Sequence, residues 1–368
     1  MERWCVVVGV AALGVLSAAW VEAQEGEVVR LAFTGDVALT RHGMTFMLGH
    51  PGPLAWEDNP LRPVAPWFKE ADLTVVNLEG VLTRDHRVVR SISPKYFLWS
   101  PVGWANIFAP AHVDVVSVAN NHGFDAGAAG LLETIGAVEA TGVHVIGGGA
   151  TTARARAPYI HPVGEGCVAV VPGTLLSNQP VVPGDADLAY YPQRRPDALF
   201  EAIRGAAARC DVVVAYVHWG LGATRQPGAW LRTVAHEMRR AGADVIVGHH
   251  PHVLQGVEFI DGGVVAYSLG NLVFANPDPA WRQGGVLMVE VRVGERAKIE
   301  AVSLRPTWVS SPEVEARPNS PERTRKLLPW MRGWCAPLGT RVELEGGRLR
   351  FHPDRAPPRA RPYPKPGR

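Results

Sequence analysis

The 368-residue chain has little net charge, with 37 lysines and arginines against 35 aspartates and glutamates. A formal charge of +2 is too small to indicate nucleic-acid binding, so we expect no nucleic-acid partner. The sequence has no repeat of the solenoid type and, apart from one N-terminal stretch, no segment apolar enough to cross a bilayer. Its composition, 47% hydrophobic and 20% charged, is that of a packed protein and excludes a disordered chain.

Cysteine is also scarce, with four in the whole chain. Cys5 lies in the N-terminal stretch, which leaves Cys167, Cys210 and Cys335. Three thiols permit at most one disulfide, and no two of them have the close spacing of a zinc site. We interpret these cysteines as structural or incidental.

The N-terminus has the pattern of an export signal. Arg3 precedes an uncharged stretch over residues 4–20, and Val21-Glu22-Ala23 then offers small residues before Gln24. This order is typical of a secretory signal peptide over residues 1–23. An uncleaved membrane anchor is the alternative, because the stretch is only a little shorter than a membrane span. In both cases we expect the protein to be extracytoplasmic: periplasmic, secreted, or anchored and facing outward.

Apolar, β-branched runs alternate with helical patterns along most of the chain. The runs are continuous, which is typical of strands covered on both faces, and their alternation with helices indicates an α/β fold. Strands are predicted at 28–33, 73–76, 113–118, 143–146, 168–171, 212–217, 245–247, 264–267 and 286–293, and helices at 130–140, 196–209 and 230–240. We expect one domain over 27–310, an extension over 311–351 with a helix and a hairpin, and a disordered Pro/Arg-rich tail over 352–368.

Polar residues directly follow six of these runs. Ligands of an open α/β sheet bind beyond the carboxyl ends of its strands, so we expect these side chains to converge on one edge. They are Asp36, Glu79, the Asn120-Asn121-His122 triplet, His218, the His249-His250-Pro251-His252 cluster, and Asn271.

This donor set suits a pair of divalent cations. Imidazole with carboxylate favours Mn, Fe or Zn, whereas oxygen ligands alone would favour Mg or Ca. Two carboxylates, an Asn and three His are enough donors for two ions, with one carboxylate as a bridge. Each motif alone also has an ordinary explanation as a turn, a helix cap or a hydrogen-bonded structural residue. Three imidazoles within four residues after a buried strand are hard to explain by packing, so we interpret the set jointly.

As a set, the motifs resemble the CapA capsule-synthesis family, which is associated with poly-γ-glutamate capsule biosynthesis and belongs to the calcineurin-like metallophosphoesterase superfamily. The resemblance implies a four-layer sandwich of mixed β-sheets flanked by helices. It rests on Gly35-Asp36, Asn77-Leu78-Glu79-Gly80, Ala119-Asn120-Asn121-His122 with Asp125 and Gly127, His218-Trp219-Gly220, Gly248-His249-His250-Pro251-His252 and Ser268-Leu269-Gly270-Asn271.

The resemblance also implies roles for individual residues. Glu79 stands where the superfamily usually has a bridging Asp, His122 matches the residue that protonates the leaving group, and His249 falls outside the metal-binding pair, although spacing alone could admit it. Lys95 is a candidate contact for an anionic substrate, with a solvated lysine beside a turn as the equal alternative, and Asn271 is a second candidate. The implied metal ligands are Asp36, Glu79, Asn121, His218, His250 and His252.

Two departures from the family pattern stand out. Ala38 occupies a position where the superfamily often has a metal-binding His, which leaves one ion with an imidazole fewer. Gly222-Ala223 replaces the Glu-Tyr that often follows the His-Trp-Gly motif, and we expect this change to alter substrate contacts.

Two functional hypotheses follow. The first is an exported two-metal hydrolase for capsule, poly-γ-glutamate or another cell-envelope polymer, in which metal-bound hydroxide attacks a phosphoester or amide and His122 is the general acid. The alternative is a non-catalytic, metal-containing component that binds an anionic polymer within a membrane export assembly. His122 favours the enzyme, because a binding protein would not need a general acid.

Overall fold

The computed structural model describes residues 26–39, 52–84, 97–179, 186–194, 196–276, 278–294, 297–311 and 313–354. The predicted signal segment, Lys95 and residues 355–368 of the predicted tail lie outside these ranges. Within them, no helix is both long and apolar enough to cross a membrane.

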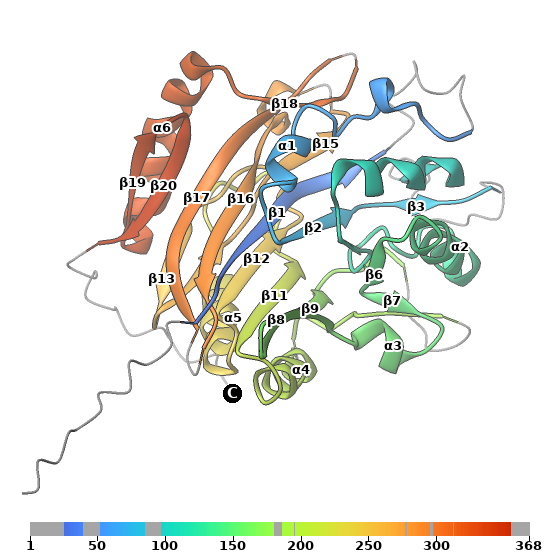
Figure 1. Cartoon of the computed structure of the whole chain (residues 1–368), viewed down its shortest axis with the longest axis horizontal. Coiled ribbons are helices and arrows are strands. Elements are labelled where there is room, and N and C mark those ends of the chain that lie inside the picture. Colours follow the sequence, from blue (N-terminus) through green and yellow to red (C-terminus); the bar gives the residue numbers. More distant parts are fainter. Residues whose placement is uncertain are drawn as a thin grey trace, which may run out of the picture.

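Two mixed β-sheets form the centre of the molecule (Figure 1). The main path of the larger sheet runs β19-β20-β17-β16-β1-β2-β5-β6, and the smaller sheet runs β13-β14-β12-β11-β9-β8. The larger sheet consists of β1 (Val28–Ala38), β2 (Leu73–Leu78), β5 (Val115–Ser117), β6 (His144–Ile146), β16 (Gln283–Arg292), β17 (Lys298–Val309), β19 (Thr340–Glu345) and β20 (Arg348–Pro353), with β15 (Asn271–Phe274) beside β1 and β18 (Ala316–Pro318) beside β17. The smaller sheet consists of β8 (Tyr159–Val163), β9 (Gly166–Thr174), β11 (Val212–His218), β12 (Val245–His249), β13 (Val257–Ile260) and β14 (Gly263–Ala266).

Alternation of side chains along buried strands creates three apolar cores. In β1, Leu31 and Phe33 pack against the other sheet in a core that includes Val212 and Val214 of β11, whereas Ala32 faces the opposite way into a second core. Both faces of the strand are therefore apolar, which explains the continuous hydrophobic runs in the sequence. A third core lies on the outer face of the smaller sheet.

Helices cover the two outer faces. On the larger sheet, α2 (Gly127–Glu139) buries Leu131 and Val138, and α1 (Ala65–Phe68) lies over the same core. On the smaller sheet, α4 (Asp197–Ala207) and α5 (Ala229–Arg240) bury apolar residues such as Ile203 and Val234. The layers are thus helix, sheet, sheet and helix, so the predicted fold class is confirmed. Every predicted strand and helix overlaps an observed one.

The C-terminal segment joins the larger sheet. Here α6 (Pro321–Cys335) begins after Ser320, whose hydroxyl accepts a hydrogen bond from the Arg323 amide, and it buries Leu327 and Met331 in the inter-sheet core. The hairpin of β19 and β20 then pairs with β17 (Figure 1). The short elements elsewhere are α3 (Thr152–Arg156), the strand pairs β3 (Val81–Leu82) with β4 (Trp99–Ser100) and β7 (Gly148–Gly149) with β10 (Asp187–Leu188), and the 3-10 helices η2 (Trp56–Asp58), η5 (Val102–Ile107), η6 (Ala109–Ala111), η7 (Pro279–Trp281) and η8 (Ala336–Leu338).

One disulfide joins Cys167, near the start of β9, to Cys210, in the turn that leads from α4 to β11. It is the single bridge that the cysteine count permits. Cys335 is free and buried, and burial raises the pKa of its thiol to about 12. This thiol is therefore uncharged at neutral pH and unreactive.

Candidate metal centre

The parallel strands of both sheets end at one edge and bring the polar residues together there. Asp36 lies in β1 with Asn77 of β2 on one side and Asn271 of β15 on the other. His218 is the last residue of β11 and pairs in register with His249, the last residue of β12. The approach of β1 to β15 requires glycine at position 35, since a Cβ there would clash with the Gly270 carbonyl.

All six predicted ligands meet at this edge. Donor atoms of Asp36, Glu79 and His218 lie within 4.8 Å of one another, and those of Glu79, His250 and His252 form a second such group. The predicted ligand Asn121 places its Oδ1 2.7 Å from Nε2 of His218. Glu79 belongs to both groups, which is the arrangement that a bridging carboxylate requires.

The carboxylate of Glu79 is the strongest indication that this edge could hold a cation. Its side chain is 0% exposed, and neither oxygen has a hydrogen-bond partner among the described residues. Oε1 lies 3.6 Å from Nε2 of His252 and 3.8 Å from Nε2 of His218. These distances are a little longer than the roughly 3–3.5 Å that would separate two donors at about 2.1 Å from one ion. A buried carboxylate without hydrogen bonds is costly, and a divalent cation is the group that these residues fit.

The protonation states of the buried side chains also favour a cation site. Burial raises the pKa of Glu79 to about 7. Burial would lower the pKa of His252, but Glu79 and Asp36 together raise it to about 9, so His252 carries a proton at neutral pH. Burial lowers the pKa of His250 to about 4 and that of His218 well below its ordinary value, which keeps both imidazoles neutral and able to ligate.

Asp36 is held in place by four donors. Its Oδ1 accepts a hydrogen bond from Nδ2 of Asn77 at 2.8 Å and lies 3.0 Å from Nδ1 of His249. Its Oδ2 accepts from the His250 amide at 3.2 Å and lies 3.4 Å from Nδ1 of His252. Burial raises the pKa of Asp36, but the hydrogen bonds from His249 and His252 outweigh it and hold the pKa well below the usual range. His249 thus orients a ligand and belongs to neither ligand group.

The turn that carries the paired imidazoles is strained. His250 has φ = 93° and His252 has φ = 57°, values that non-glycine residues rarely adopt. A hydrogen bond from the Ala223 amide to the Pro251 carbonyl, 2.9 Å long, supports the turn. Strain of this kind persists where the surroundings enforce it, and it is common at functional sites.

His122 stands beside the ligand groups without joining them. Its Nδ1 lies 2.7 Å from Oδ2 of Asp125, and its Nε2 lies 4.0 Å from Oε1 of Glu79. Asp125 also accepts a hydrogen bond from the Leu98 amide. The ring is therefore oriented with Nε2 toward the centre, where it can meet a substrate.

Asn271, a predicted substrate contact, is fully buried. Its Oδ1 lies 3.0 Å from Nδ1 of His252, and its Nδ2 donates to the Trp281 carbonyl. The ring of Trp281 stacks on His252 with 5.1 Å between centroids. In this arrangement Asn271 and Trp281 orient His252.

Two neighbours of the site were given no role from the sequence, although Asn77 was part of a quoted motif. Asn77 is in β2 and Glu79 is the first residue after that strand, and the spacing of two could have suggested that both face the same way. Asn178, in the loop after β9, places Nδ2 3.3 Å from Nε2 of His122. No local pattern marked Asn178, because its position depends on how that loop folds.

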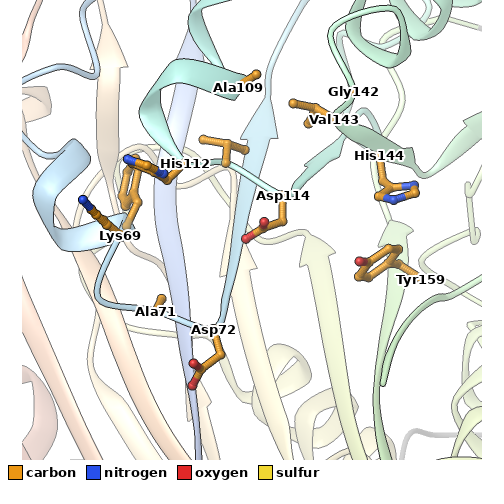
Figure 2. Close-up of a pocket in the computed structure, with 12 residues that line it drawn as sticks. Lys69, Ala71, Asp72, Ala109, His112, Asp114, Gly142, Val143, His144 and Tyr159 are labelled. Atoms are coloured by element: carbon orange, nitrogen blue, oxygen red, sulfur yellow. The ribbon is translucent and has the colours of Figure 1, made fainter. Parts of the chain in front are cut away.

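A cavity of ≈530 Å³ lies elsewhere, at the amino ends of β2, β5 and β6 (Figure 2). Asp72, Asp114 and His144 line it, and each precedes or begins one of these strands. None of the predicted site residues that the structure describes borders it, so the candidate centre is assigned from its donor atoms and not from this cavity.

The sequence matches the family described as Bacterial capsule synthesis protein PGA_cap over residues 30–276. The chain belongs to this family. Among curated PGA_cap relatives, the PGA biosynthesis protein CapA of Bacillus subtilis is 28% identical over 273 residues, which are 71% of this chain and 66% of that protein. The Capsule biosynthesis protein CapA of Bacillus anthracis is 27% identical over 323 residues, 81% of this chain and 75% of that protein. The chain thus spans slightly less than two thirds of the Bacillus subtilis relative.

Solved structures give a more distant likeness. The calcineurin-like phosphoesterase YfkN from Bacillus subtilis is 13% identical, with a TM-score of 0.47 over 84% of this chain and 98% of that chain. A hypothetical protein from Thermus thermophilus is 17% identical, with a TM-score of 0.41 over 75% of this chain and 98% of that chain. The family model describes capsule synthesis proteins, and the chemistry of this chain has to be argued from its site.

Proposed function

We propose that this chain is an extracytoplasmic, metal-dependent hydrolase that acts on an anionic cell-envelope polymer during capsule or poly-γ-glutamate biosynthesis. The observation that carries the proposal is the buried carboxylate of Glu79, which accepts no hydrogen bond from the described residues and is shared between two groups of imidazole and carboxylate donors. A hydrogen-bonded imidazole, His122, lies beside it.

The residues divide between two ions. Asp36, Glu79, Asn121 and His218 would hold one, and Glu79, His250 and His252 would hold the other. Their mixed oxygen and nitrogen donors favour Mn, Fe or Zn. When bound, such a pair of ions lowers the pKa of a coordinated water and neutralises charge on the group being attacked.

The chain's own side chains supply the rest. Asp125 accepts a hydrogen bond from Nδ1 of His122. The other ring nitrogen, Nε2, can then carry the proton that is given to the leaving group. Asn77 and His249 fix Asp36, and Asn271 fixes His252, so the donors are positioned before a ligand arrives. The substrate class is a phosphoester or an amide of a glutamyl or related polymer.

Placement outside the cytoplasm has two supports. The N-terminal stretch has the order of a signal peptide or anchor, and the Cys167–Cys210 disulfide is typical of oxidising compartments. Partners in a membrane assembly for polymer export would fit this location.

The test is metal analysis of the purified chain followed by a substrate screen. We expect two divalent ions per chain and hydrolysis of either bis(p-nitrophenyl) phosphate or γ-glutamyl oligomers, abolished by chelation and restored by Mn, Fe or Zn. A metal-loaded chain that binds the oligomers without cleaving any substrate would instead support the non-catalytic polymer-binding role. A chain that takes up no divalent metal would refute both.

A further inference from the structure

The loop between β11 and α5, residues 219–228, carries a single charged residue, Arg225. This loop directly follows His218. It also contains Gly222-Ala223, where the sequence departs from the family pattern.

The loop is attached to the turn that presents the paired imidazoles. The Ala223 amide donates to the carbonyl of Pro251, the residue between His250 and His252. Nε2 of Gln255 donates to the Thr224 carbonyl at 2.7 Å. Ala223 itself has φ = 60°, so the backbone has an unfavourable conformation at the residue that is hydrogen-bonded to the turn carrying His250 and His252. Arg225 therefore has a fixed relation to the candidate centre.

The guanidinium of Arg225 is also fixed. It lies 5.1 Å from the ring centroid of Trp334 in α6, and its Nη2 donates to the Ala280 carbonyl at 3.1 Å. Ala280 precedes Trp281, whose ring stacks on His252. The contact to Ala280 uses one of the five N–H donors of the side chain.

Across the described ranges, no carboxylate lies within 4.0 Å of this guanidinium. Asp278 interacts with it electrostatically from farther away, and Oδ1 of Asp278 already caps η7 by accepting from the Ala280 amide. Partial burial lowers the pKa of Arg225, as expected for a cation that has lost water without gaining an anion. By contrast, Arg232 at the start of α5 pairs with Glu258.

We propose that Arg225 binds a carboxylate or phosphate group of the anionic ligand, on the side of the reacting bond next to His250 and His252. The inference rests on the proposed function only in that the ligand is an anion bound at the metal centre. A planar guanidinium recognises either group through two parallel hydrogen bonds. The competing explanation is that Arg225 only joins the loop to α6, and the choice of substitution separates the two.

Arg225→Met keeps an unbranched apolar side chain but removes the guanidinium, with its charge and its contact to the Trp334 ring. Arg225→Lys keeps the charge without the planar fork. Arg204→Met is the matched control, because Arg204 is an exposed arginine of α4 paired with Glu201. Each is made in the full chain with His122→Ala, loaded with Mn, so that ligands stay intact.

Affinity is measured by calorimetry with penta-γ-glutamate, tripolyphosphate and inorganic phosphate. We expect Arg225→Met to lower the affinity for one of the two extended anions, penta-γ-glutamate or tripolyphosphate, by about tenfold or more. Arg225→Lys should lower this affinity less, and Arg204→Met should leave it unchanged. Sensitivity of penta-γ-glutamate identifies a carboxylate, and sensitivity of tripolyphosphate identifies a phosphate. Inorganic phosphate, which reaches only the metals, should bind equally to all variants with the same metal content.

Equal affinity of Arg225→Met and its parent for both extended anions, including no binding by either, overturns the inference. So does parallel loss of metal or of inorganic phosphate binding, which would show that Arg225 only supports the turn. Failure of the proposed hydrolase is distinguishable, since it appears as an absence of cleavage by the unmodified chain whatever the result for Arg225.

Discussion

Oδ2 of Asp125 lies 2.7 Å from Nδ1 of His122, and the pair stands beside the metal-ligand groups without entering either. A carboxylate on one ring nitrogen leaves the other free to exchange a proton with a ligand. The same carboxylate accepts the Leu98 amide, which fixes its own orientation. This relationship separates proton transfer from metal binding, so the two can be tested separately.

His122→Ala should lower turnover by about 10²–10⁴-fold, the usual contribution of a general acid, while leaving the fold and the metal content unchanged. Steady-state kinetics with metal analysis of the same sample measures both. Asp125→Asn should slow turnover less, because the ring remains in place but loses its charged partner. Hydrolysis by His122→Ala at the unmodified rate would remove His122 from the mechanism.

The sequence was informative where local chemistry determines the structure. Strand β1 is apolar on both faces, so its run was visible, and Asp36 was notable because it comes just after that run. Asn178 and Arg225 could not be found in this way. Their neighbours are distant in sequence (His122 for one, Trp334 and Ala280 for the other), and only the folded loops bring them together. The pairing of β20 with β17 also depends on tertiary contacts that no local pattern encodes.

His250→Ala should reduce metal content, because it removes one donor from the group formed with Glu79 and His252. We expect the ion shared by Glu79, His250 and His252 to be lost first, with stoichiometry falling from two toward one. Elemental analysis after dialysis measures this, with His352→Ala as the control because that imidazole is half-exposed on β20, in the C-terminal hairpin. Full retention of both ions by His250→Ala would contradict the assignment.

Loss of the Cys167–Cys210 disulfide should destabilise the fold by about 2–4 kcal/mol, since the bridge closes a long loop across β9 and α4. Urea unfolding of the double Cys→Ala variant measures the change. In the oxidised chain that begins at Gln24, a thiol reagent should find no reactive group until the protein unfolds and exposes Cys335. A readily modified thiol in the native protein would show that the bridge is not formed.

Export should leave a mature chain that begins near Gln24, because Val21-Glu22-Ala23 provides the small residues that a signal peptidase recognises. N-terminal sequencing of the protein from its native host decides this. Retention of Met1 in a membrane fraction would indicate an anchor instead, with the folded part still facing outward.

Metal loading should release protons, because two ligands of the metal-free chain hold them at neutral pH. The pKa of His252 is about 9, so at pH 7 its imidazole is protonated and must lose that proton to bind a metal. The pKa of Glu79 is about 7, which adds about half a proton at the same pH, whereas His250, with a pKa of about 4, is already neutral. From these two residues, metal binding should thus release more protons at pH 7 than at pH 9.5. The apparent affinity for the metal should accordingly rise from pH 6 to 9 and then level off.

Calorimetric titration of Mn into the metal-free chain, in two buffers that differ in ionisation enthalpy, measures the number of protons released. Proton uptake at pH 7, or no release of protons at all, would mean that metal binding does not displace protons from His252 and Glu79.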